Sequence, residues 1–252
     1  MSGSPWCIDD RSFMGERYFV ASCVFSVGYP ELSRKIRAYI AERFGFDIVR
    51  CCVPRYKLQE FTDRMPEAYR GEWSALPDCG DFAAGDTVYS ICHNCSAVLE
   101  ETKPDVVVKS LWELVLSDRE FVYPDFHGAP VYVQDCWRAY DRKDEQLAVR
   151  GLLEMMNFRV MEPAESRERT RFCGISLYRP APPRNLKLAP RRFVENAPGL
   201  FMPHSPERQR ELMEAHCRQF GSSPVVCYCH YCHEGLKLGG ASARHLAELL
   251  FG

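Results

Sequence analysis

The chain has 252 residues, of which 46% are hydrophobic and 26% are charged, a balance typical of a folded globular protein with one or two domains. Its net charge of -2 at pH 7 excludes the strongly basic surface that nucleic-acid binding requires, so we expect no nucleic-acid partner. The N-terminal segment lacks a signal-like pattern, and the apolar stretch 18–27 is too short to span a bilayer. We expect a cytoplasmic protein without a membrane span, in which 13 cysteines indicate metal or redox chemistry rather than disulfides.

The first half of the chain predicts a strand, a helix and a second strand. Residues 18–22 are aromatic and β-branched and lead directly into Cys23. Residues 30–44 begin with proline, carry apolar side chains at helical spacing and stop at a glycine, as a helix does. Residues 46–49 predict the next strand, which leads to a cysteine pair. This is a βαβ unit, whose loops gather at one edge of a parallel sheet.

The second half repeats this order. Residues 131–135 predict a strand that enters Cys136, residues 147–156 predict a helix, and residues 158–161 predict a strand that precedes Cys173.

The two halves also end alike. Strand-like runs at 87–91 and 224–228 each precede a C-x2-C motif, and an apolar tail follows each motif, at 110–116 and 244–251. Corresponding features in one order indicate an internal duplication.

We therefore predict an α/β protein of two tandem, related Rossmann-like βαβ domains with cysteine clusters at the strand-to-helix loops. The domains would comprise residues 1–125 and 126–252. The second would carry a proline-rich insertion around 180–203, which we expect to be an irregular loop. A helix is predicted to begin at Pro206 and to end by Gly221.

Nine cysteines form two groups of the same order, one in each half. The first group consists of Cys23, Cys51, Cys52, Cys92 and Cys95. The second group consists of Cys136, Cys173, Cys229 and Cys232. Thiolates are soft ligands that hold zinc or iron–sulfur clusters, and four suffice for either. The first group has an additional thiol in an adjacent pair, which favours an expanded cluster because neighbouring side chains can serve different irons.

These motifs resemble the CCG, or cysteine-rich, domain found in heterodisulfide reductase and in related iron–sulfur oxidoreductases. The segments YFVASCVFSVGYP, ICHNCSAVLEE, QDCWRAYDR and RFCG carry the likeness, which extends from about Tyr18 to Phe251. The resemblance implies a noncubane four-iron four-sulfur cluster on the first cysteine group and a second cluster on the other. It also implies an oxidoreductase subunit that reduces a disulfide-type substrate or passes electrons within a complex.

Two positions depart from the family pattern. Val53 follows the first cysteine pair where the family often has glycine, and Phe172 stands where a second pair would begin. The second site is therefore open to three interpretations, which are a four-cysteine iron–sulfur cluster, a zinc ion and no metal. Cys227 could supply the missing sulfur. The alternative function is a zinc-binding or metal-free interaction module that keeps the fold without redox activity.

Three histidines lie in or beside the C-x2-C motifs, namely His93, His230 and His233. They could tune a cluster or carry protons, but we expect solvated loop positions for them. Five further residues are expected to be structural, namely Cys7, Cys79, Cys217, Trp112 and Trp137.

The sequence contains no serine nucleophile elbow, phosphate loop or dinucleotide fingerprint, which removes support for hydrolase and nicotinamide functions. The closely spaced cysteine run of ferredoxin-type sites is also missing. An electron-handling protein of this kind needs a relay from another chain. We expect a redox partner subunit that carries ferredoxin-type clusters or flavin, in an anaerobic setting.

Overall fold

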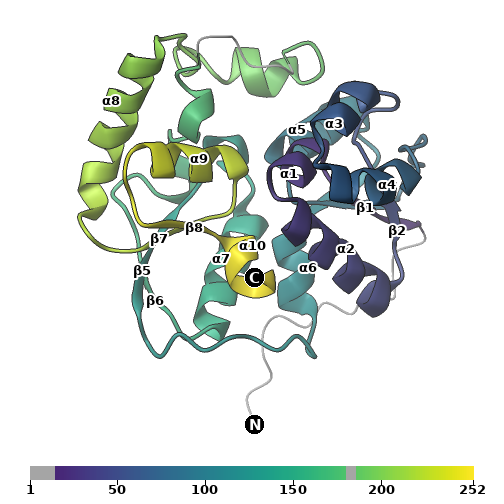
Figure 1. Ribbon diagram of the computed structural model, residues 1–252, viewed down its shortest axis with the longest axis horizontal. Helices are drawn as coiled ribbons and strands as arrows, with labels where there is room; N and C mark the ends of the chain where they lie inside the picture. Colours follow the sequence, from purple (N-terminus) through teal and green to yellow (C-terminus); the bar gives the residue numbers. More distant parts are fainter. Residues whose placement is uncertain (1–14, 180–185) are drawn as a thin grey trace.

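Two parallel four-stranded sheets form the framework of the protein (Figure 1). The computed structural model describes residues 15–179 and 186–252. The strand order is β2-β1-β3-β4 in the first sheet and β6-β5-β7-β8 in the second. All neighbouring strands in both sheets are parallel. The two halves therefore share one topology, as the internal duplication predicts.

The four strands of each half follow one another along the chain with helices between them. The first sheet consists of β1 (Arg17–Val20), β2 (Asp47–Val49), β3 (Thr87–Ser90) and β4 (Val107–Ser110). The second consists of β5 (Pro130–Gln134), β6 (Arg159–Met161), β7 (Val225–Cys227) and β8 (Ala243–His245). The helices of the first half are α1 (Cys23–Gly28), α2 (Pro30–Phe44), α3 (Leu58–Arg64), α4 (Glu67–Ala75), α5 (His93–Thr102) and α6 (Leu111–Ser117). Those of the second half are α7 (Lys143–Met155), α8 (Pro206–Cys217), α9 (His230–Leu238) and α10 (Leu246–Phe251).

Local sequence signals set the ends of the longer helices. Pro30 occupies the first turn of α2, and Gly45 ends it in the left-handed conformation with φ 63°. Ser205 caps α8, because its hydroxyl accepts a hydrogen bond from the Arg208 backbone N–H. Within the proline-rich segment, residues 186–203 form turns and one helical turn, Arg191–Glu195, while 180–185 lie outside the described residues.

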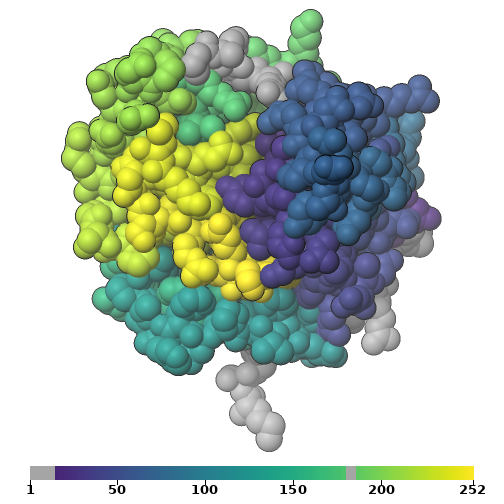
Figure 2. All heavy atoms as spheres, viewed as in Figure 1, coloured from purple at the N-terminus to yellow at the C-terminus, as the bar shows by residue number. Residues whose placement is uncertain are grey.

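Helices of each half pack against helices of the other half. The tail helix α6 of the first half packs against α7, and the tail helix α10 of the second half packs against α2 (Figure 1). Buried residues of both halves, such as Trp112 and Leu152, belong to one hydrophobic core. In Figure 2 the C-terminal elements, in yellow, lie directly against the purple N-terminal elements. No helix of the described residues is long and apolar enough to cross a bilayer.

Candidate metal centres

The cysteines of both groups lie just beyond the carboxyl ends of strands. Cys23 begins α1 after β1, and Cys92 is the residue before α5, directly beyond β3. Cys136 and Cys229 occupy the corresponding positions after β5 and β7. Because parallel strands end at one edge of a sheet, each group converges there. The free backbone N–H groups at the start of α5 and α9 favour negative charge on these thiols.

In the first site, all five predicted cysteines line one small cavity of about 30 Å³. Four of them are buried and Cys52 is partly exposed. The Cys23 and Cys51 sulfur atoms are 3.7 Å apart. Tyr231, which belongs to the second half, lines the same cavity. The site is therefore completed by a residue from the other repeat.

The five thiols of the first site are close enough to shift one another's pKa values. Although burial opposes it, hydrogen bonds from Cys23 and Cys52 lower the pKa of Cys51 to about 3. The neighbouring Cys95 thiol lowers the pKa of Cys92, although burial opposes it. The pKa values of Cys23, Cys52 and Cys95 are raised, so the site combines thiols that ionise readily with thiols that keep their proton.

The four thiols of the second site also converge. The Cys136 and Cys173 sulfur atoms are 3.6 Å apart. Burial and hydrogen bonds to the other three thiols raise the pKa of Cys232 well above its usual value. Although burial opposes it, hydrogen bonds from Cys136 and Cys232 lower the pKa of Cys173. All four cysteines are buried.

A buried arginine accompanies these four thiols. The Arg138 guanidinium donates a hydrogen bond from Nη1 to the Cys173 sulfur at 2.5 Å and a second one to Ser176 Oγ at 3.0 Å. Its carbon also lies over the Tyr231 ring at 4.9 Å. Within residues 15–179 and 186–252, no carboxylate forms a salt bridge with Arg138. The thiols are therefore the negative partners of this cation, and its positive charge favours their ionised form.

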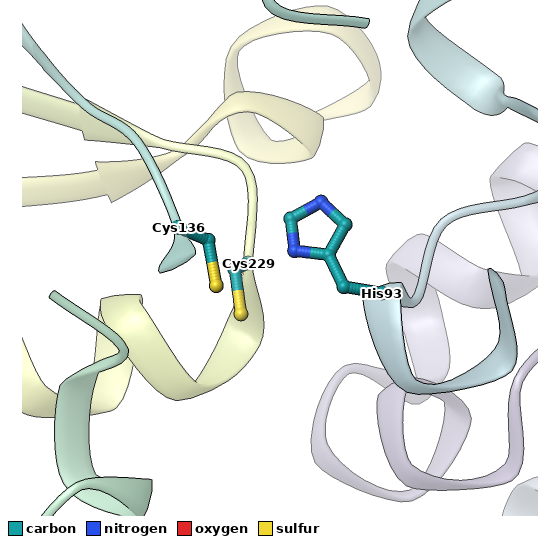
Figure 3. A group of neighbouring side chains, drawn as sticks. All are labelled: His93, Cys136 and Cys229. Carbon is teal, nitrogen blue, oxygen red and sulfur yellow. The ribbon is translucent and has the colours of Figure 1, made fainter. Parts of the chain in front are cut away.

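His93 belongs to the first half of the chain, but its side chain lies at the second site. Its ring lies beside Cys136 and Cys229, and the three potential ligand atoms are within 4.8 Å of one another (Figure 3). His93 Nε2 lies 3.0 Å from a carboxylate oxygen of Glu145. Burial lowers the pKa of His93, but the charges of Glu145 and Cys229 outweigh burial and raise it to about 10.

The expectation of solvated histidines is wrong. His93 and His230 are each 3% exposed, and His233 is fully buried. His233 Nδ1 shares a 2.7 Å hydrogen bond with the Tyr29 hydroxyl of the first half. The sequence shows these residues beside cysteines in loops, but contacts between the repeats bury them.

The remaining cysteines and tryptophans lie where structural residues are expected. The Cys227 thiol contacts the Arg244 carbonyl at 3.8 Å, and the Cys217 thiol contacts the Leu236 carbonyl at 3.6 Å. Cys79 is buried in the core, as are the tryptophans Trp112 and Trp137. Cys7 lies outside the described residues. Cys227 is therefore not grouped with the four thiols of the second site.

No family model, curated protein or solved structure matches the chain significantly. The function of the chain is therefore inferred from the chemistry of the two thiol groups.

Both groups have the donors that a metal centre needs. Soft thiolates are the ligands of zinc and of iron–sulfur clusters, and the first site offers five and the second four. A tetrahedral ion about 2.3 Å from each sulfur separates neighbouring sulfurs by about 3.8 Å, close to the 3.7 Å and 3.6 Å of the two measured pairs. His93, Cys136 and Cys229 lie close enough together to hold a metal ion, and the donor type alone does not select which one.

Sequence reasoning missed Arg138 and Glu145 at the second site. Arg138 lies two residues after Cys136, and a cation so close to a proposed thiolate ligand was a usable signal. Glu145 carries no such signal, because only the packing of α7 against the first half brings it to His93.

Proposed function

We propose that the protein is an iron–sulfur redox subunit of the heterodisulfide reductase type. The observation that carries the proposal is the convergence of five thiols at one sheet edge and four at the equivalent edge of a duplicated sheet. One buried site with an adjacent cysteine pair is unusual for a single structural ion, which takes four ligands. Two thiol-rich sites in one chain suit a device that moves electrons between them.

The residues of the first site would hold the cluster where substrate reacts. Cys23, Cys51, Cys52, Cys92 and Cys95 supply its thiolates, and the bound cluster would supply single electrons. Cys52 is the partly exposed member, so the substrate would approach from its side of the cavity. Val53 and Tyr231 line this cavity and would limit the access of water.

The substrate class is a disulfide or a related sulfur compound. Its reduction consumes two electrons and two protons, breaks one S–S bond and yields two thiols. The electrons would come from a redox partner subunit with ferredoxin-type clusters or flavin, through Cys136, Cys173, Cys229 and Cys232 at the second site. Such chemistry fits a cytoplasmic protein of an anaerobic organism.

A disulfide-reduction assay tests this proposal. The protein, purified without oxygen, is mixed with reduced methyl viologen and a dialkyl disulfide, and released thiols are counted. We expect thiol release by the native chain and its loss in Cys52→Ser, because the first cluster loses a ligand. Cys79→Ala, which changes a buried cysteine outside both groups, should retain activity. Equal rates for Cys52→Ser and the native chain would contradict the proposal.

The alternative is a zinc-bound module that serves interaction rather than redox chemistry. The thiol separations favour it, because both measured pairs are close to the edge of a tetrahedron around one ion. Such a module would use the metals only to hold the loops at the two sheet edges. It would be colourless and would release no thiols in the assay.

A further inference from the structure

His93 is a residue of the first half whose ring belongs spatially to the second site. It is the first residue of α5, between Cys92 and Cys95 of the first thiol group. Figure 3 shows the ring edge that carries Nδ1 turned toward the sulfur atoms of Cys136 and Cys229. Nδ1 is buried, and it has no hydrogen-bond partner of standard geometry among the described residues. A buried ring nitrogen that faces two thiols without such a partner is available for a metal.

The other ring nitrogen is fixed by a carboxylate. Glu145 is 2% exposed and pairs with Arg142 through one oxygen at 2.7 Å and with His93 Nε2 through the other at 3.0 Å. The ion pair with Arg142 keeps this carboxylate ionised, so it accepts hydrogen bonds only. Nε2 therefore carries a proton, and Nδ1 has the lone pair once a metal displaces any proton there. A carboxylate that holds the second nitrogen of a ligating histidine is a recurrent arrangement in metal proteins.

The second site has one thiol fewer than the first. It offers four thiols where the first offers five, and Phe172, beside Cys173, stacks on His216 with ring centroids 3.8 Å apart. Cys227 does not join the four, because its thiol contacts the Arg244 carbonyl. His93 is the additional donor that the described residues bring to this site.

We propose that His93 Nδ1 is a metal ligand of the second site, together with thiolates of its cysteine group. The second centre is then a mixed histidine–cysteine site for a soft divalent metal or an iron–sulfur cluster, and one of its ligands comes from the first repeat. The chain segment Cys92–Cys95 therefore serves both sites, with cysteines bound to the first and the histidine to the second. The two centres are linked directly, because His93 is the chain neighbour of Cys92.

Cadmium-113 NMR of the full chain tests this directly. The protein is labelled with ¹⁵N in histidine, stripped of metal and loaded anaerobically with ¹¹³Cd²⁺, which replaces zinc or iron at thiolate sites. We expect a cadmium resonance split by one-bond coupling to ¹⁵N in the native chain and unsplit in His93→Gln. His127→Gln, at a histidine whose side chain is 85% exposed, should keep the splitting.

Absence of splitting in the native chain would overturn the proposal, whether or not His93→Gln folds. Splitting that survives in a folded His93→Gln protein would also overturn it. The outcome is independent of the proposed redox function, because cadmium reports ligands in zinc and iron sites alike. A chain without iron and sulfide that still shows the coupling would refute the redox function and support His93 as a ligand.

Discussion

Arg138 donates a hydrogen bond to a thiol of the second site. Arg138 is 3% exposed. Its guanidinium lies over Phe193 at 5.2 Å and over Tyr231 at 4.9 Å, and it reaches the Cys173 sulfur. A buried cation is costly unless negative charge accompanies it. Here that charge comes from thiolates, so Arg138 both requires an anionic site and stabilises one.

Replacing Arg138 should therefore weaken metal binding at the second site. We expect Arg138→Met to bind zinc about 10- to 100-fold more weakly at that site, as for other residues that hydrogen-bond to metal ligands. Arg138→Lys keeps the charge without the forked geometry, so its zinc affinity should lie between those of the native chain and of Arg138→Met. Competition with a chromophoric zinc chelator measures the affinities, and an Arg138→Met protein with native affinity would contradict this role.

His216 makes the stability of the fold sensitive to mild acid. Burial lowers its pKa to about 4, while an unfolded histidine titrates near 6.5. Between these values only the unfolded chain takes up the proton, so His216 contributes stability above about pH 6.5 that is lost as the pH falls toward 4.

His216→Phe should flatten this pH dependence. The free energy of unfolding, measured in urea, should fall less steeply between pH 6.5 and pH 4, by up to about 1.4 kcal/mol per pH unit for one proton. His127→Phe, at an exposed histidine, should keep the native slope. Identical slopes for His216→Phe and the native chain would refute the assignment.

The sequence predicts the grouping of the cysteines but not the burial of the neighbouring histidines. The cysteines could be grouped from their order alone, since strand ends of a parallel sheet meet at one edge. The burial of His93 and His233 could not be predicted, because their partners Glu145 and Tyr29 belong to the other repeat. The local sequence indicates that these histidines lie in loops, whereas the contact between the repeats determines how exposed their side chains are.

Among the helices and turns, one backbone contact holds the second site together. The single turn Gly174–Ser176 follows Cys173 and packs on α9, which carries Cys232. A Cβ atom on Gly235 of α9 would lie 2.6 Å from Gly174 Cα. Only glycine permits this approach, which keeps the turn after Cys173 against the helix that carries Cys232.

Gly235→Ala should therefore separate the turn from α9. We expect a loss of about 1–3 kcal/mol in the free energy of unfolding, as for other overpacked buried positions, and weaker zinc binding at the second site. Gly71→Ala is the matched control, because no atom lies within 4 Å of its Cβ position in α4, and there helix propensity predicts a gain of up to about 1 kcal/mol. Native stability of Gly235→Ala, measured in urea, would contradict the account of this contact.

Sequence patterns predicted the strands that precede cysteines and the three longest described helices, α2, α7 and α8, but not helices such as α3, α4, α5 and α9. The helix Pro30–Phe44 and the strands before Cys23 and Cys136 lie where their patterns place them, within one or two residues. β4 and β8 were not predicted, because each is a short strand that runs directly into a tail helix. Such strands are defined by pairing with β3 and β7, a non-local interaction that three or four residues do not encode.

In the complete molecule, helices and side chains of each repeat contact the other repeat. α6 packs on α7 and α10 on α2, Tyr231 lines the first site, and His93 enters the second. Each half therefore completes the other, and the buried core extends across both. The sequence predicts the duplication, but the shared core depends on how the repeats dock, which the pattern within one repeat does not describe.

The metal and sulfide content of the protein tests the redox function most directly. The full chain is purified without oxygen, and iron, acid-labile sulfide and zinc are measured per chain, with an electron paramagnetic resonance spectrum of the same sample. Two clusters predict about eight irons and a matching amount of sulfide, and occupation of the five-cysteine site alone predicts about four. Zinc without sulfide in a colourless protein would contradict the redox function and identify the chain as a zinc-bound module.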